Sequence, residues 1–197
     1  MNTARKRTTP AKLSGKSQPD RRLAKTRTSL AMALFALMQQ RNWDDISVQE
    51  ICDTADVARS SFYAHFDSKV MLLDHTILRS LEQSREARKQ QAGPMGLLAW
   101  IVDHVTENRT MFNRVARGGG AQIVLSRFKA ALCAELAEEI RLSGVGAPLL
   151  QAHFILGGTF DSLIAWSKTW KTSQLPSVKV DILAMATCVC RSADPLI

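Results

Sequence analysis

The sequence lacks the features that mark membrane proteins, secreted proteins and thiol-based sites. None of its apolar runs reaches the roughly 18 residues that suggest a membrane span. No apolar core follows the basic N-terminus, as it would in a signal peptide. The four cysteines form no C-x-x-C pair, which disfavours a zinc site or a redox motif. We therefore expect a cytoplasmic protein with reduced thiols and no contact with a membrane.

The common signatures of catalytic and metal sites are also missing. The sequence has no Gly-x-Ser-x-Gly elbow for a serine nucleophile and no Gly-x-x-x-x-Gly-Lys loop for a phosphate. His104, His153 and Asp161 could be imagined as metal ligands or as an acid–base pair, but no H-x-x-x-H or Glu-x-x-His spacing supports a metal. A lone histidine in an apolar helix is more often a hydrogen-bonded core residue. We expect no catalytic residue, no metal and no cofactor.

Aromatic residues and strand patterns are scarce as well. Phe, Trp and Tyr make up 6% of the residues, and Tyr63 is the one tyrosine. Strand-like alternation is almost absent, whereas long stretches repeat apolar residues every three or four positions, which is the period of a helix. The 197 residues, of which 46% are hydrophobic, suffice for one or two domains with a sizeable core. The pattern predicts an all-α fold.

Positive charge is concentrated at the N-terminus. Residues 1–27 hold nine basic side chains and one acidic side chain, whereas residues 28–197 hold 17 of each. Residues 1–20 contain almost no large apolar side chain and many Thr, Ser, Lys and Pro residues, so we expect a disordered basic tail. Such a tail either solubilises the protein or follows the phosphates of a nucleic acid.

The stretch SVQEICDTADVARSSFYAHFDSK indicates two short helices, a tight turn between them, and the start of a third helix. Ser47 stands three residues before Glu50, which is the spacing of a capping box at the start of a helix. Asp56 follows this helix and tolerates the left-handed backbone of a sharp turn. In the next helix, Phe62 and Phe66 share one side, which leaves the polar side chains between them exposed. This is the layout of a helix-turn-helix, whose second helix enters the major groove of DNA.

Residues 24–73 resemble the DNA-binding domain of the TetR/AcrR family of transcriptional regulators, most closely in SVQEICDTADVARSSFYAHFDSKVMLL. The block FYAHFDSK is the most specific part of the resemblance. Two positions depart from the family pattern: Asp56 stands where the family usually has Gly, and Ala58 where it often has Ser or Thr. Because Ala58 has no hydroxyl, we expect Ser60 or Asp56 to cap the second helix in a shifted register.

The resemblance also implies which residues contact DNA. Arg59 is expected to pair with guanine edges, and Ser60 with a base or the backbone. The family motif adds contacts to phosphates from Ser61, Tyr63, His65 and Lys69, together with the helix start at Ser47. It further implies a homodimer, whose two domains meet successive major grooves about 34 to 36 Å apart on a palindromic operator.

We divide the chain at its clearest breaks in pattern. A helix over residues 22–40 repeats Leu along one face and braces the short helices. A helix from Lys69 to about Gln90 ends in the charged run EQSREARKQQ, which we interpret as a solvated face. Gly93 and Pro94 form the clearest break after it. The resulting parts are a disordered tail (1–20), a helix-turn-helix domain (21–68), a connecting helix (69–93) and a helical regulatory and dimerisation domain (94–197).

The helices after residue 94 are apolar on several sides, so they need partners. Family likeness places a four-helix dimer interface in the last two long helices, where Gly157 and Gly158 would let backbones approach; alternatively, these glycines relieve crowding within one subunit. The three glycines 118–120 are expected to be a mobile joint. We also expect an apolar cavity for a small hydrophobic ligand, although core packing explains the same residues nearly as well. Its candidate lining residues are Trp100, His104, Met111, Phe112, Phe128 and Phe154.

These patterns together predict a ligand-responsive DNA-binding regulator, a repressor by family likeness. Its expected partners are double-stranded DNA, a second copy of the chain and a small hydrophobic ligand. Two alternatives stay open. One is a regulator controlled by a protein partner without a small ligand, and the other is an enzyme with an attached DNA-binding domain.

Overall fold

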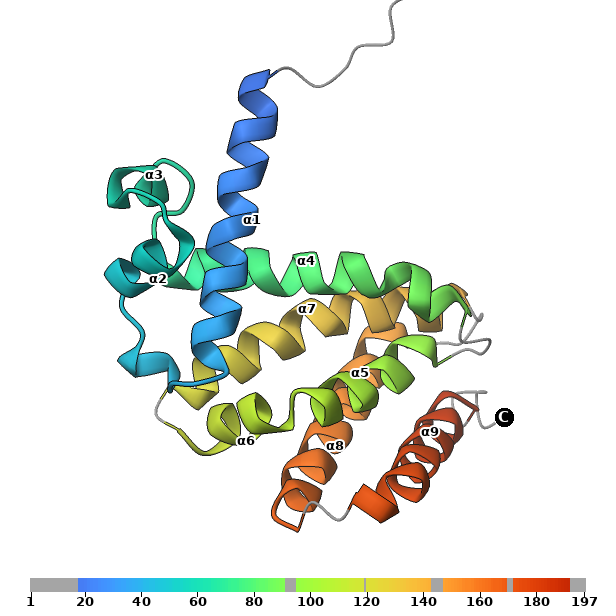
Figure 1. Ribbon diagram of the computed structural model, residues 1–197. Helices are drawn as coiled ribbons and strands as arrows, with labels where there is room; N and C mark the ends of the chain where they lie inside the picture. Colours follow the sequence, from blue (N-terminus) through green and yellow to red (C-terminus); the bar gives the residue numbers. More distant parts are fainter. Residues whose placement is uncertain (1–17, 91–94, 119, 143–146, 170–171, 192–197) are drawn as a thin grey trace, which may run out of the picture.

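The computed structural model describes residues 18–90, 95–118, 120–142, 147–169 and 172–191, which form helices and no strand (Figure 1). The prediction of an all-α fold is confirmed. The α-helices are α1 (Gln18–Met38), α2 (Val48–Ala55), α3 (Arg59–Tyr63), α4 (Lys69–Gln90), α5 (Gly96–Glu107), α6 (Arg109–Arg117), α7 (Ala121–Leu142), α8 (Pro148–Ser167) and α9 (Leu175–Arg191). Two 3₁₀ helices, η1 (Trp43–Asp45) and η2 (Thr172–Gln174), precede α2 and α9.

Helix α1 begins at Gln18 rather than at residue 22, so residues 18–20 of the predicted disordered tail belong to the helix. Pro19 lies in the first turn, where the N–H that proline lacks would have no helical partner, and this favours a helix start there. Residues 1–17 of the predicted tail lie outside the described residues.

Helix α2 and the turn after it form as the sequence predicts. The Ser47 hydroxyl accepts a hydrogen bond from the Glu50 N–H, and the Glu50 carboxylate accepts one from the Ser47 N–H, which completes the capping box. Asp56 ends the helix with φ of 52°, in the left-handed region. Ile51 and Cys52 are fully buried and fasten α2 to the core. Local signals therefore suffice to define this element.

The start of helix α3 differs from the prediction. Ala58 is the N-terminal flanking residue and forms no side-chain hydrogen bond, and no hydrogen bond of the described residues makes Ser60 or Asp56 a cap instead. Phe62, which is fully buried, packs against Phe66 with ring centroids 5.9 Å apart. Burial of these two rings, rather than a cap, holds this short helix on the domain.

Helix α4 joins the N-terminal helices to the rest of the molecule. It crosses beneath α1 and packs against α5 and α7 further along (Figure 1). One continuous cluster of buried apolar side chains extends from Leu30 in α1 to Cys190 in α9. The helices on the two sides of the break near residue 93 therefore share a core.

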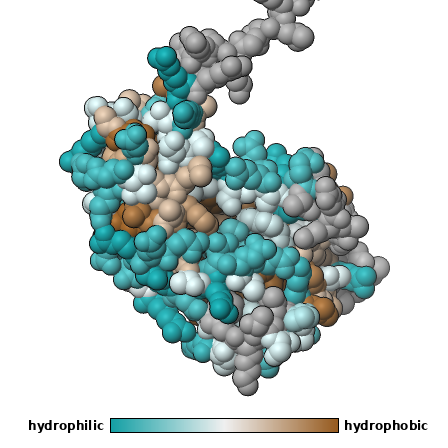
Figure 2. All heavy atoms as spheres, viewed as in Figure 1, coloured by the Kyte–Doolittle hydropathy of each residue, from teal (hydrophilic) through white to brown (hydrophobic). Residues whose placement is uncertain are grey.

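Helices α5 to α9 form the larger part of the molecule. Helix α8 packs against α7 and α9, and α6 contacts α5, α7 and α8. In Figure 1 the α2–α3 pair lies at one end and the α8–α9 pair at the other. Figure 2 shows hydrophilic residues over most of this face, with apolar residues concentrated near the N-terminal helices. The α8–α9 pair thus lies far from the α2–α3 pair, which resembles a DNA-binding helix-turn-helix.

Candidate nucleic-acid interface and ligand cavity

Helix α3 presents its polar side chains to solvent because its two Phe neighbours face inward. Arg59, Ser60 and Tyr63 are exposed, and Ser61 is half-buried. The Arg59 guanidinium donates a hydrogen bond to the Tyr63 hydroxyl at 3.4 Å and lies 5.7 Å from the centre of the Tyr63 ring. Arg59 is therefore oriented by a residue one turn further along the same helix. His65 follows α3 and is half-buried beside Phe66.

Ser47 uses its hydrogen-bonding groups inside the protein. Its N–H and its hydroxyl both donate to Glu50 Oε2, at 2.9 and 2.8 Å. The backbone hydrogen bond from Ser47 is the main cause of the lowered pKa of Glu50, which also forms an ion pair with Arg41. A phosphate at this helix start would thus meet a carboxylate whose charge Arg41 offsets, and the Ser47 groups would have to leave the cap to bind it.

Lys69 lies where it supports the fold rather than where it faces solvent. Its Nζ donates hydrogen bonds to the carbonyl oxygens of Trp43 and Ile46, both at 2.7 Å, and lies 4.2 Å from the centre of the Trp43 ring. Burial lowers the pKa of Lys69. The structure therefore places this ammonium as a brace between the start of α4 and the turn before α2, and the expected phosphate contact is not its main role here.

Replacing Lys69 by Met tests this difference. The two carbonyls would lose a charged donor, so we expect the free energy of unfolding to fall by about 1.5 to 3 kcal/mol, measured by urea unfolding. The salt dependence of DNA affinity should stay the same. Lys25→Met, which changes an exposed lysine of α1, serves as the control with near-normal stability. Normal stability of Lys69→Met together with a salt slope reduced by about 0.9 would restore the phosphate role.

A cavity of about 80 Å³ lies between helices α1, α4, α5, α6 and α7. Four of the predicted residues line it, namely His104, Met111, Phe112 and Phe128. Trp100 is outside the lining but stacks on His104, with ring centroids 4.7 Å apart and an interplanar angle of 22°. The structure thus gathers five of the six candidates at this cavity.

Phe154 is a wrong prediction for the cavity. It is 68% exposed and borders a surface groove between α8 and α9. Its chain neighbours Ala152 and Ile155 face the core instead. Because α8 is apolar almost all round, its sequence does not show which side is buried. Packing against α7, a contact between separate helices that periodicity within α8 cannot show, decided which face is buried.

The cavity walls also include residues that sequence reasoning missed. Phe35 and Met38 come from α1, and Leu73, Thr76 and Ile77 come from α4. Both helices carry the α2–α3 pair. The helical periodicity predicted an apolar face on each of these two helices, but it could not show that the second part of the chain leaves a space beside them. The cavity therefore directly borders the part of the molecule that contains the α2–α3 pair.

A chain of hydrogen bonds runs from the cavity to the end of α1. The Asn108 amide nitrogen donates to the His104 carbonyl at 2.9 Å and lies 3.4 Å from His104 Nδ1. Gln39, which directly follows α1, donates from Nε2 to Asn108 Oδ1 at 3.0 Å. Burial lowers the pKa of His104, because it disfavours the charged imidazolium.

The corner between α6 and α7 packs tightly against the turn before α2. Gly120 has φ of +68°, and a Cβ there would lie 2.5 Å from Asp44 Oδ1 and from Trp43 Cδ1. Arg114 donates a hydrogen bond to the Gln40 carbonyl. The described glycines of the predicted mobile joint thus form a close contact, while Gly119 lies outside the described residues.

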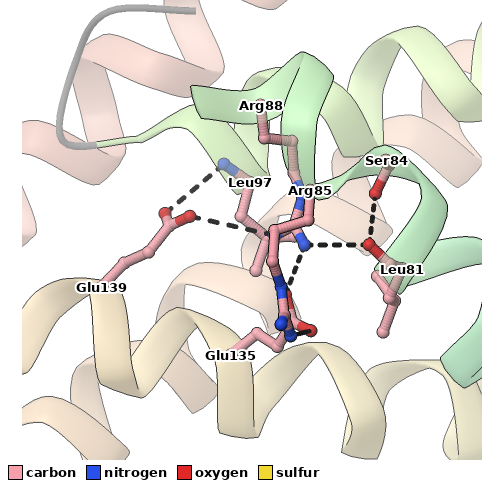
Figure 3. A network of polar contacts seen from close by, with 7 residues as sticks. All are labelled: Leu81, Ser84, Arg85, Arg88, Leu97, Glu135 and Glu139. Carbon is pink, nitrogen blue, oxygen red and sulfur yellow. Dashed lines mark hydrogen bonds and ion pairs between the residues drawn. The ribbon is translucent and has the colours of Figure 1, made fainter. Parts of the chain in front are cut away.

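Arg88 anchors the far end of α4 (Figure 3). Its side chain is 7% exposed, and its Nη2 lies 2.6 Å from Glu135 Oε2 and donates to the Leu81 carbonyl at 3.1 Å. Glu139 lies 3.9 Å from Nη1 and accepts from the Leu97 N–H at 3.4 Å. Burial is the main cause of the raised pKa of Glu139. The interpretation of this charged run as a solvated face is therefore wrong at Arg88, which ties α4 to α7.

Helices α8 and α9 leave a large apolar face open. A Cβ added at Gly157 or Gly158 would meet no atom within 4 Å. Gly158 also borders the groove between the helices. The exposed apolar side chains on these two helices include Leu149, Leu150, Phe154, Val180 and Met185. The glycines therefore do not relieve crowding inside the subunit, and they lie where a second chain could approach.

Other classes of site find no support in the described part of the chain. No described helix is both long enough and apolar enough to cross a membrane. Among the same residues, no group of three or more His, Cys, Asp or Glu side chains could hold a metal ion.

Comparison with known proteins finds a family match in the N-terminal part. Residues 31–76 match the family model described as bacterial regulatory proteins, tetR family. The comparison with curated proteins finds no match. The matched segment covers the second half of α1, the α2–α3 pair and the start of α4.

Several solved structures are similar over most of the chain. A TetR transcriptional regulator from Streptococcus agalactiae 2603V has a TM-score of 0.61 and 21% identity, covering 85% of this chain and 97% of that chain. NalD, described as the secondary repressor of the MexAB-OprM multidrug efflux pump in Pseudomonas aeruginosa, has a TM-score of 0.52 and 16% identity, covering 85% and 96%. RolR in complex with resorcinol has a TM-score of 0.56 and 18% identity, covering 90% and 97%. At these identities the likeness shows the fold.

Proposed function

Since the chain belongs to the tetR family of bacterial regulatory proteins and is a DNA-binding transcriptional regulator, we propose that it is a homodimeric repressor that leaves its operator when a small ligand enters the cavity. The observation that carries the DNA-binding part is the exposed surface of α3, on which Arg59, Ser60 and Tyr63 point away from two buried Phe rings. A five-residue helix with such a polar face suits the major groove.

The open face of α8 and α9 supports assembly with a second copy. Exposed apolar side chains on adjacent helices favour a partner, because their burial removes apolar surface from water. A two-fold axis through this face would pair α8 and α9 with the same helices of the second chain. The two α3 helices would then reach two half-sites of a palindromic operator.

The position of the cavity supports a response to a small molecule. Its walls include α1 and α4, so a bound ligand contacts both helices that carry the DNA reader. Arg88 fixes the C-terminal end of α4 to α7. A displacement of α4 at the cavity would therefore move mainly its N-terminal end, which follows α3. A ligand shifts the equilibrium between the DNA-bound and the released arrangement of the protein only by binding one of the two more tightly. NalD, a repressor by description, and RolR, which holds resorcinol, have this fold.

Sequencing the DNA that the purified protein retains from a random pool tests the proposal. We expect a palindrome with two equal half-sites. For Arg59→Ala we expect base preference to relax by about 1 to 3 kcal/mol at one position of each half-site, because a bidentate contact to guanine is lost.

Arg59→Lys is the matched control, since it keeps the positive charge but not the planar pair of donors. It should bind random DNA nearly as the wild type does and still lose the base preference. Equal losses on operator and random DNA for Arg59→Ala would show that Arg59 contacts only phosphates.

A further inference from the structure

The cavity carries information about the chemistry of its ligand. Its lining holds no Asp, Glu, Lys or Arg side chain. Burying a charged ligand group there without a partner would cost more free energy than its contacts with the apolar walls would contribute. A cavity needs about 10 to 15 Å³ of such space to hold one water molecule. The cavity of about 80 Å³ therefore accommodates on the order of five to eight non-hydrogen atoms, roughly one ring with or without a substituent.

The polar groups of the lining are few and lie on two walls. Thr76 and Ser80 are on α4, and His104 and Asn108 are at the end of α5. The Thr76 hydroxyl already donates to the Leu72 carbonyl at 2.7 Å. Both oxygen and nitrogen of the Asn108 amide also have partners inside the protein. Among the lining residues, this leaves the Ser80 hydroxyl and the His104 ring with hydrogen-bonding capacity, and only His104 carries it on an aromatic ring.

The hydrogen bonds around Asn108 fix the tautomer of His104. The His104 carbonyl can only accept, so the Asn108 atom that faces it at 2.9 Å must be the NH₂ group. The same NH₂ group lies 3.4 Å from Nδ1, and this contact favours the tautomer in which Nδ1 is the acceptor nitrogen. The proton of the neutral ring is therefore on Nε2, and no described residue accepts a hydrogen bond from it. His104 thus brings one N–H donor to the lining of the cavity, with Trp100 stacked on its ring and Phe128 tilted beside it.

We propose that the cavity selects a compact, uncharged ring compound with one oxygen that accepts a hydrogen bond from His104 Nε2, and that Asn108 and Gln39 transmit its binding to α1. This rests on the proposed function, because it names the ligand class of the same regulatory cavity. If His104 moves when it binds the ligand, its contact with the Asn108 amide changes. Asn108 is in turn hydrogen-bonded to Gln39, which directly follows α1. Ligand binding would thus affect the position of the α2–α3 pair through α1 as well as through α4.

Three probes with the same number of non-hydrogen atoms test the ligand class: phenol, toluene and cyclohexylammonium. Dissociation constants are measured by NMR titration of the full-length protein. We expect phenol to bind about threefold to tenfold more tightly than toluene, the worth of one hydrogen bond, and cyclohexylammonium not to bind. In His104→Phe the preference for phenol over toluene should disappear. In His104→Gln, whose amide keeps a donor, part of the preference should return.

The link to α1 is tested with Gln39→Leu. Phenol affinity is measured with and without the operator, and the ratio of the two values is the coupling factor. We expect a smaller ratio for Gln39→Leu than for the wild type. An unchanged ratio overturns the role of Gln39.

Other outcomes overturn the ligand class. They are tight binding of cyclohexylammonium, an unchanged phenol preference in His104→Phe, or no binding of any probe to the wild type. Operator affinity without a probe is measured in parallel and depends only on the proposed DNA-binding function. A protein that binds its operator but none of the probes would therefore keep that function and lose this inference.

Discussion

Arg88→Met is expected to lower the free energy of unfolding by about 3 kcal/mol, because it removes the buried cation between Glu135 and Glu139 and leaves Glu135 with the exposed Arg85 alone. Glu135 and Glu139 are partly exposed, which places the effect at the lower end of the range for a broken buried pair. For a chain of this size the loss corresponds to a fall in Tm of about 6 to 12 °C. Urea unfolding and thermal unfolding measure both quantities.

Arg85 provides a matched control for Arg88. It lies one turn earlier on α4 and also approaches Glu135, at 3.5 Å, but its side chain is 58% exposed. Exposed ion pairs contribute about 0 to 1 kcal/mol, so Arg85→Met should leave stability nearly unchanged. Equal effects of Arg85→Met and Arg88→Met would mean that burial of Arg88 does not matter.

A triple variant separates the lost charge from the lost packing. Adding Glu135→Gln and Glu139→Gln to Arg88→Met removes the two carboxylates that Arg88 paired with, so we expect it to recover roughly half of the lost stability. A triple variant that is less stable than Arg88→Met alone would contradict this explanation.

The helix-turn-helix could be predicted from sequence because its signals are local. The capping box of Ser47 and Glu50 spans four residues, and the left-handed turn depends on the backbone of Asp56 alone. Phe62 and Phe66 stand four residues apart and pack against each other, although α3 ends at Tyr63 and Phe66 lies beyond it. Local signals do not depend on how distant segments pack, so one sequence suffices to read them.

The contacts that sequence reasoning missed all join distant segments. Lys69 binds carbonyls of the turn before α2, more than twenty positions earlier in the chain. Arg88 lies in a run whose charges predict a solvated face, and it is buried only because α7 packs against α4 at this point. The cavity walls on α1 have the same origin, since Phe35 and Met38 meet residues of α5 to α7. Periodicity shows that a face is apolar, but not what covers it.

Phe154 illustrates how packing can reassign a residue from one site to another. Its aromatic ring and its position next to His153 indicated a cavity residue, but the structure exposes it on the face of α8 that borders α9. Exposed Phe is unfavourable in a lone subunit, and neighbouring Met185 and Leu150 extend the apolar patch. We therefore assign Phe154 to the proposed dimer interface.

Phe154→Asp is expected to separate the subunits, because a two-fold interface would place two like charges in an apolar contact without partners. The control is Leu78→Asp, which replaces an exposed apolar residue of α4 away from this face. The separated chains should keep the helical content of the control but unfold at a lower temperature, because they lose the stabilisation that association provides. Sedimentation should then show monomers for Phe154→Asp and dimers for Leu78→Asp. Operator affinity should fall by about 10² to 10⁴ for Phe154→Asp, since each half-site then binds without the linked second one. Affinity for a single half-site should stay the same in both variants. If Phe154→Asp stays dimeric and binds the full operator normally, the interface lies on another face of the molecule.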